Sequence, residues 1–141
     1  MEIWRDSQIL YDGKIVRLRV GEVELDNGHT AQREVVEHPG GVCIVPVVDG
    51  GVLLVRQFRI AVGDYVLEAP AGKMEPGDSP ESRGRAELEE EVGYRAGTMH
   101  ALGGVYATVG FCSERIHLFM ASDCTPAQVD PDDEERIEIV R

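Results

Sequence analysis

Apolar and polar residues alternate along the first part of the chain with the two-residue period of half-buried strands. The alternating stretches cover residues 8–11, 15–25 and 30–37, and an Asp-Asn-Gly turn at 26–28 separates the last two. Turns of this composition join antiparallel strands into hairpins. The pattern therefore predicts N-terminal strands that include one long antiparallel hairpin.

The next apolar runs are continuous, which is typical of strands buried on both faces. Residues 42–48 and 52–58 flank an Asp-Gly-Gly turn and are predicted to form a second hairpin. Further strands are predicted at 99–108, 116–121 and 137–140. No internal repeat, low-complexity tract or interdomain linker interrupts these elements. They are therefore expected to form a mixed sheet packed on helices.

Residues 80–92 carry the signals of the one clear helix. Ser79 is a good N-cap, and Pro80 fits the first helical turn, where its missing N–H is harmless. Gly93 can take the left-handed conformation that ends a helix. These signals predict both ends of the helix.

The faces of this predicted helix differ in character. At about 100° per residue, one stripe is small or apolar and is expected to be buried. It consists of Gly84, Leu88 and Val92. Glu87 and Glu91 line one flank of the stripe, with Glu90 a little further round and Glu89 on the opposite side. Like charges at this spacing repel by about 0.2–0.5 kcal/mol per pair, so the flank is expected to need a nearby cation.

Spacing alone leaves two interpretations of these glutamates open. Clustered carboxylate oxygens suit a hard divalent cation, Mg²⁺ or Mn²⁺, which also prefers to share a phosphate ligand. The alternative is a solvated acidic face, which is what a run of charges usually forms. Only the first interpretation gives the helix a chemical role.

Composition limits the class of protein. The 141 residues suffice for one domain with one core. No run of about 18 apolar residues and no signal-peptide pattern directs the chain to a membrane, so a cytoplasmic protein is expected. The net charge of −12 argues against a nucleic-acid partner, because phosphate binding needs clustered Lys and Arg. A small anionic substrate would have to enter with metal ions that cancel the local charge.

Other chemistry-bearing residues lack the spacing of a site. The three cysteines show no paired metal spacing and are odd in number, so thiols are expected rather than disulfides or a zinc site. They are Cys43, Cys112 and Cys124. His38, His100 and His117 are expected to be packed or surface residues. The acidic run at 130–135 is expected to be a solvated loop.

The segment GKMEPGDSPESRGRAELEEEVGY at residues 72–94 resembles the signature of the Nudix hydrolases, G-x5-E-x7-R-E-U-x-E-E-x-G-U, where U is a bulky apolar residue. The matching positions are Gly72, Glu87, Leu88, Glu90, Glu91, Gly93 and Tyr94. Two positions depart from the signature. Asp78 replaces a Glu and keeps its charge, whereas Ala86 replaces an Arg that steadies the glutamates in the family. Arg83, one turn before Glu87 on the same flank, is placed to compensate, whereas Arg85 points to the other side.

Longer segments resemble the ADP-ribose pyrophosphatase branch of this family. They are REVVEHPGGVCIVPV (33–47), VRQFRIAV (55–62), LEAPAGKMEPGD (67–78) and TVGFCSERIHLFMA (108–121). The resemblance implies an α+β fold: a Nudix-type α/β/α sandwich with a mixed β-sheet, N-terminal antiparallel strands and one catalytic helix. It implies a single Nudix domain over 1–141, with N-terminal strands at 1–38 that serve as a dimerisation arm and a core at 39–141. The family commonly has another helix after the last strand, where this sequence stops.

The same resemblance implies Mg²⁺-dependent hydrolysis of ADP-ribose to AMP and ribose 5-phosphate, with Mn²⁺ as a possible replacement for Mg²⁺. Glu87 and Glu91 would be the main metal ligands, Glu90 a ligand or base, and the backbone carbonyl of Ala71 a further ligand. Gly72 would let the chain approach the metal closely, although an ordinary turn glycine is the alternative. Clustered metal ions make the attacking water more acidic and neutralise the phosphoryl oxygens.

Further roles follow from the flanking matches. Glu114 corresponds to a glutamate on a mobile loop that positions or deprotonates water in this branch. The substrate-recognition candidates are Arg33, Arg59 and Glu68, because an arginine fork binds phosphate and stacks on adenine better than lysine does. The choice between Arg59 and Arg56 is open, and surface ion pairing is the alternative role for each.

The resemblance also implies a homodimer in which the N-terminal strands exchange between subunits, with Trp4 and Tyr11 as candidate aromatic anchors. Three functions stay open at this point. They are an ADP-ribose pyrophosphatase, a pyrophosphatase of another nucleoside diphosphate sugar, and a non-catalytic ligand-binding module favoured by Ala86 and the missing last helix.

Overall fold

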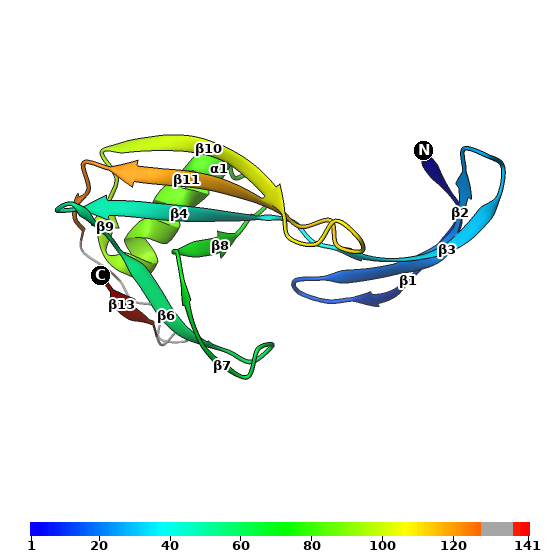
Figure 1. Ribbon diagram of the computed structural model, residues 1–141, viewed down its shortest axis with the longest axis horizontal. Coiled ribbons are helices and arrows are strands. Elements are labelled where there is room, and N and C mark those ends of the chain that lie inside the picture. Colours follow the sequence, from blue (N-terminus) through cyan, green and yellow to red (C-terminus); the bar gives the residue numbers. More distant parts are fainter. Residues whose placement is uncertain (128–136) are drawn as a thin grey trace. The chain divides into compact units, whose positions relative to one another are not determined.

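The computed structural model describes residues 1–127 and 137–141, and the predicted acidic loop at 130–135 lies outside them. The chain divides into two compact units. Residues Met1–Gly40 and Tyr106–Arg115 form what we call the N-terminal unit, and Gly41–Val105 with Ile116–Arg141 form the core unit. Figure 1 shows the elements of both.

The N-terminal unit contains a three-stranded antiparallel sheet in the order β1-β2-β3. The strands are β1 (Glu2–Asp12), β2 (Arg17–Leu25) and β3 (Thr30–Glu37). Gly28 takes a φ of 81° in the predicted turn, and the Leu25 N–H donates to the carbonyl of His29 at 2.8 Å. The hairpin is confirmed, but the strand predicted at 8–11 is much longer, because β2 offers pairing groups along all of β1.

The core unit is built on a mixed sheet in the order β10-β11-β4-β5, with β8 also paired to β4. The strands are β4 (Gly41–Val48), β5 (Gly51–Val52), β8 (Ala71–Lys73), β10 (Thr98–Tyr106) and β11 (Arg115–Ser122). β4 runs parallel to β11 and antiparallel to β5 and β8. The predicted mixed sheet is therefore confirmed.

The strand predicted at 52–58 is interrupted. Leu53 is buried between β5 and β6 (Leu54–Arg59), and its N–H donates to the carbonyl of Pro46 at 3.1 Å. β6 leaves that sheet and pairs with β7 (Asp64–Glu68) and β13 (Glu138–Val140). The prediction of burial on both faces is wrong for this run, because the second sheet leaves Phe58 47% exposed.

Among the described residues, four short strands were not predicted from the sequence. They are β7, β8, β9 (Tyr94–Arg95) and β12 (Thr125–Pro126), of which the last two pair with each other. Runs of two to five residues are too short to show a two-residue period. β8 matters most for the site, because it carries Ala71 and Gly72.

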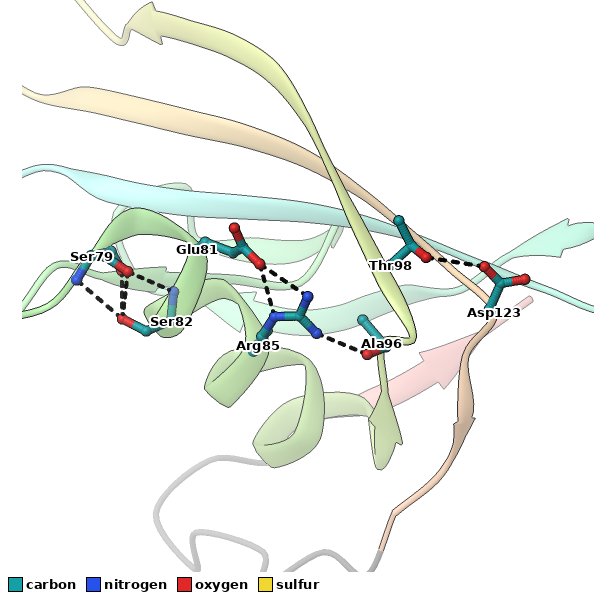
Figure 2. A network of polar contacts seen from close by, with 7 residues as sticks. All are labelled: Ser79, Glu81, Ser82, Arg85, Ala96, Thr98 and Asp123. Carbon is teal, nitrogen blue, oxygen red and sulfur yellow. Dashed lines mark hydrogen bonds and ion pairs between the residues drawn. The ribbon is translucent and has the colours of Figure 1, made fainter.

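The predicted helix is present in two parts, α1 (Pro80–Glu87) and the π-helical turn η1 (Leu88–Val92). Ser79 caps it, since its hydroxyl accepts from the Ser82 N–H at 3.1 Å while the Ser82 hydroxyl accepts from the Ser79 N–H at 3.0 Å (Figure 2). Gly93 ends the helix at a φ of 73°. The expectation of a regular α-helix to residue 92 is wrong in its last turn, and π turns are frequent at functional sites.

The predicted buried stripe of the helix packs on the core sheet. Leu88 and Val92 are buried with core residues of β4, β6 and β11, and α1 lies along the sheet in Figure 1. A Cβ on Gly84 would lie 3.2 Å from a Val42 methyl and 3.3 Å from Ile44 Cγ1. The lack of a side chain therefore lets the helix approach β4 closely. The α+β fold with a mixed sheet, N-terminal antiparallel strands and one helix is confirmed.

Two further observations bear on the sequence predictions. All three cysteines are free, as predicted. Within the described residues, none of the helical segments has the length and apolar character needed to cross a membrane.

Candidate functional site

The acidic flank of the helix faces β8. Glu87 is only 5% exposed, and a Cβ added to Gly72 would overlap the Glu87 carboxylate. Glu91 lies one turn further along, where its Oε2 accepts from the Ala71 N–H at 3.0 Å. Two predicted ligands on the helix therefore lie against the two predicted backbone positions on β8. Gly72 is required for this approach and is not an ordinary turn glycine.

Arg83 is the cation of this flank. Its Nη2 pairs with Glu87 Oε1 and lies 3.6 Å from Glu90 Oε2. Burial lowers the pKa of Arg83, but the charge and hydrogen bond of Glu87 and the charges of Glu90 and Glu75 outweigh it, so the pKa lies above its ordinary value. The position expected from helical spacing is therefore confirmed for this arginine.

The other flank of the helix has cations of its own. Arg85 bonds to Glu81 Oε1 at 3.0 Å and to the carbonyl of Ala96 at 2.8 Å, which holds it away from the glutamate cluster (Figure 2). Arg95 forms a two-pronged pair with Glu89 at 2.8 and 2.9 Å, and its hydrogen bond lowers the pKa of Glu89. Glu89 thus lies on the flank away from Glu87, as its predicted side of the helix implied.

The donor set fits a hard divalent cation in kind. It offers carboxylate oxygens and main-chain groups, and the missing side chain of Gly72 lets the Glu87 carboxylate lie directly against β8. In the part of the chain that the structure describes, no three His, Cys, Asp or Glu side chains converge as a ready metal site. The present partners of the acids explain this, because Arg83 holds Glu87 and the Ala71 N–H holds Glu91.

Two of the recognition candidates pair with each other. Arg59 donates from Nε and Nη2 to the two carboxylate oxygens of Glu68, at 2.7 and 3.1 Å. They lie on the neighbouring antiparallel strands β6 and β7. Arg56 instead pairs with Glu138 at 3.2 Å and lies 4.8 Å from the centre of the Tyr65 ring. The geometry distinguishes the two arginines, since only Arg59 is joined to another recognition candidate.

Arg33 belongs to the N-terminal unit. It makes a two-pronged pair with Glu2, at 2.9 and 2.6 Å, and this hydrogen bonding lowers the pKa of Glu2. The pair lies in the wall of a hollow of about 410 Å³, whose other lining includes Trp4 and Phe111. Arg33 therefore stands beside aromatic rings in a hollow large enough for a small molecule.

Glu114 also belongs to the N-terminal unit, on the loop between β10 and β11. Two backbone bonds attach this loop to β3, from the Val36 N–H to the carbonyl of Phe111 at 2.7 Å and from the Ser113 N–H to the carbonyl of Val36 at 2.9 Å. The hydroxyl of Ser113 accepts from the His38 N–H at 3.0 Å. The position of the loop is thus set by β3 and the residue after it.

His38 is the residue that sequence reasoning missed. Its Nδ1 accepts from the Gly40 N–H at 3.0 Å and lies 3.5 Å from Glu114 Oε1. It was expected to be an ordinary packed or surface histidine, and its partners lie 75 and 76 residues away. No short-range pattern signals such a contact. The His-Pro-Gly sequence at 38–40 offers only a turn signal.

Two of the cysteines, Cys43 and Cys124, have thiols that are partly buried. Burial raises the pKa of Cys43, whose strand pairs with β8, and the charges of Glu91 and Glu68 raise it further. Burial also raises the pKa of Cys124. Because the thiolate is the reactive form, neither thiol is a favourable nucleophile near neutral pH.

Three kinds of comparison relate the chain to known proteins, through a family model, similar sequences and a solved structure. The family model described as the NUDIX domain matches residues 37–141. An ADP-ribose pyrophosphatase of Bacillus subtilis (strain 168) is 37% identical over 134 residues, which cover 93% of this chain and 72% of that protein. A methanol dehydrogenase activator of Bacillus methanolicus is 38% identical over 116 residues, which cover 82% of this chain and 63% of that protein.

The third comparison concerns the fold. A solved structure of an ADP compounds hydrolase aligns with a TM-score of 0.86 at 24% identity, covering 99% of this chain and 76% of that one. This likeness confirms the sandwich fold expected from the sequence. The chain spans 63% of the length of the Bacillus methanolicus relative and 72% of that of the Bacillus subtilis relative.

Proposed function

Because the chain belongs to the Nudix family and resembles an ADP-ribose pyrophosphatase of that family, we propose that it hydrolyses the pyrophosphate bond of ADP-ribose to AMP and ribose 5-phosphate in the presence of Mg²⁺. One observation carries this proposal. The buried Glu87 lies against Gly72, on the same helical segment as Glu90 and Glu91. A solvated acidic face would have no reason to bury a carboxylate in the space that a side chain at position 72 would occupy.

The residues of the chain have distinct proposed tasks. Glu87 and Glu91, with the carbonyl of Ala71, would hold the cation, and Glu90 would act as a further ligand or as a base. When bound, divalent cations make water more acidic and neutralise phosphoryl charge, and Mn²⁺ can replace Mg²⁺ at such oxygen sites. Glu114 would orient the attacking water or accept its proton. The backbone bonds between this loop and β3 support this role by fixing the segment that carries the carboxylate.

Substrate recognition is assigned to Arg33, Arg59 and Glu68, together with Gly72 as a close backbone position. Both arginines already make two-pronged bonds to a carboxylate. A phosphate group offers the same spacing of oxygens as a carboxylate, so substrate would replace Glu2 or Glu68 as the partner. This exchange is possible for any nucleoside diphosphate sugar. A pyrophosphatase of another such sugar is therefore the second candidate function.

The third possibility, a non-catalytic binding module, rested largely on Ala86. Arg83 weakens that argument, because it places a cation on Glu87 and Glu90 from the preceding turn. The substrate test separates all three functions. Purified protein is incubated with ADP-ribose and other nucleoside diphosphate sugars, with Mg²⁺ and with a chelator, and released nucleoside monophosphate is measured.

We expect Mg²⁺-dependent AMP release that is fastest with ADP-ribose. Faster turnover of another nucleoside diphosphate sugar would move the protein to the second function. No release from any member of the panel, by protein shown to be folded, would rule out both enzymatic functions.

The assembly is part of the same proposal. We propose a single Nudix domain with its core at 39–141, and a cytoplasmic homodimer that uses the N-terminal strands at 1–38 as its arm. Several apolar side chains of this region are exposed, namely Ile3, Ile9, Leu10, Tyr11 and Ile15. Trp4 instead packs beside Arg19, 5.7 Å from the guanidinium carbon, so Tyr11 is the better candidate anchor. Light scattering after gel filtration should give twice the mass of one chain, and a monomer at micromolar concentration would contradict the arm.

A further inference from the structure

We propose that Arg83 is a positioning residue, which holds Glu87 and Glu90 together and supplies from position 83 the positive charge that Ala86 lacks. The structural part of this inference stands on the contacts of Arg83 alone. Its catalytic consequence rests on the proposed function.

Burial makes a cation near Glu87 necessary. The side chain of Glu87 is 7% exposed, so its carboxylate has lost most of its hydration. An ionised group in that position needs a paired charge or several hydrogen bonds, and removal of its partner is strongly destabilising. Arg83 meets this need through an ion pair four residues along the helix.

Arg83 also acts on a second carboxylate. Glu90 Oε2 lies 3.6 Å from the same Nη2 atom that pairs with Glu87. The two glutamates are three residues apart and repel each other, so one cation between them lowers the cost of keeping both in place. This geometry is more than a surface ion pair, because the side chain of Arg83 is itself only 23% exposed.

No other positive residue of the helix can take this place. Residues 80–92 contain two positively charged side chains, Arg83 and Arg85. Arg85 is bound to Glu81 and to the carbonyl of Ala96 on the other flank. Ala86 contributes no charge. The matched pair of arginines on one helix therefore gives both the test variant and its control.

The contacts of Arg83 predict how metal and arginine share the cluster. Without metal, Arg83 is the counter-charge of Glu87. A protein that lacks Arg83 should therefore be less stable without metal but gain more from Mg²⁺, since Mg²⁺ then supplies the missing charge and binds only the folded state. Loss of a merely structural contact would lower stability equally in both conditions.

The first measurement is the melting temperature of four proteins, with a chelator and with millimolar Mg²⁺. We expect R83A to melt on the order of 5 °C or more below the parent in chelator, and R85A to lose less than half as much. The Mg²⁺-induced rise should be larger for R83A than for the parent and unchanged for R85A. The double variant R83A/A86R should recover at least half of the loss, because it returns the cation to the same flank.

The second measurement separates positioning from general stability. With ADP-ribose below the melting temperature, R83A should lose about tenfold or more in kcat with little change in KM, and R83A/A86R and R83K should recover part of it. A melting temperature of R83A equal to that of R85A in chelator, or an equal Mg²⁺-induced rise in R83A and parent, would overturn the proposal. If R83A does not fold, R83K takes its place with a smaller expected loss and the same criteria.

The role of Arg83 and the enzymatic activity can be contradicted independently of each other. Absence of Mg²⁺-dependent AMP release by the parent protein contradicts the proposed function and leaves the melting result in chelator as evidence on Arg83. Normal release by the parent, combined with normal melting and kcat of R83A, contradicts the role of Arg83 and leaves the function intact.

Discussion

The helix that carries Glu87, Glu90 and Glu91 and the loop that carries Glu114 hold their carboxylates in different ways. On the helix, the cation is four residues from Glu87 and the buried stripe repeats every four residues, so local geometry organises the acids. On the loop, backbone bonds to Val36 and the bond of the Ser113 hydroxyl with the His38 N–H hold the segment around Glu114 from a distant part of the chain. The comparison teaches that the positions of the helix glutamates depend on a nearby charge, whereas the position of the loop glutamate depends on how the backbone of the loop is held.

The largest expected effect tests the charged region. E87Q and E91Q should each lower kcat/KM by about 10³-fold or more while the protein stays folded, because each removes charge from the proposed metal ligands without removing volume. The measurement is AMP release at saturating Mg²⁺, with circular dichroism as the check on folding. E89Q is the matched control, since Glu89 pairs with Arg95 on the other flank. Near-parent turnover of both test variants would show that the site is elsewhere.

Next in size is the substitution of the loop carboxylate. E114Q should lower kcat by about 10²-fold or more, which is the usual contribution of a general base. It should leave the Mg²⁺-induced rise in melting temperature unchanged, because Glu114 is not among the proposed ligands. E34Q, an exposed glutamate of the same unit, serves as the control. A change in the Mg²⁺ response of E114Q would remove the proposed difference between the two regions.

A backbone substitution tests the contact of β8 with the helix. G72A should cost activity on the order of 10²-fold, because the added Cβ overlaps Glu87 and forces a proposed ligand out of position. G77A is the control, since Gly77 has a φ of 95° but no atoms within 4 Å of the added Cβ. It should lose stability and keep its activity. Equal kcat values for the two variants would show that Glu87 can move without consequence.

The smallest expected effect concerns how the loop is held. S113A removes the acceptor of the His38 N–H and should cost about 1 kcal/mol of stability with a few-fold loss of kcat. Urea unfolding and steady-state kinetics measure the two quantities. S122A, which removes a hydroxyl that contacts His100 in the core unit, is the control for loss of a serine. S113A could lower stability and leave kcat unchanged while E114Q lowers kcat. In that case the bond of Ser113 does not position Glu114 for catalysis.

The sequence allowed the helix to be predicted in detail because its determinants lie three or four residues apart. The capping by Ser79 follows from the residue type at the start of the helix, and the buried stripe and the side on which Arg83 lies follow from a constant rotation per residue. The signature at 72–94 also indicated the family before any contact was known. The features that depend on residues three or four positions apart were therefore predictable from the sequence.

Contacts between distant residues were not predictable in this way. The bonds of Ser113 with His38 and of Arg33 with Glu2 join residues 75 and 31 positions apart, and no local period reports them. The break at Leu53 also depends on residues far along the chain, because β6 pairs with β7 and β13 once it leaves the first sheet. The π turn at 88–92 was missed because helical spacing was assumed to stay constant.

That π turn has a consequence for how the chain tolerates changes in length. A π turn contains one residue more than the α-helical turn that it replaces. Deleting one residue of 88–92 would let this turn close into a regular α-helix, and the residues before and after it would keep nearly the same rotation about the helix axis. A deletion within α1 would instead rotate the residues that follow by about 100° relative to those before, because α1 has no extra residue to lose. The π turn is therefore the part of the helix in which a deletion of one residue disturbs the orientation of the neighbouring residues least.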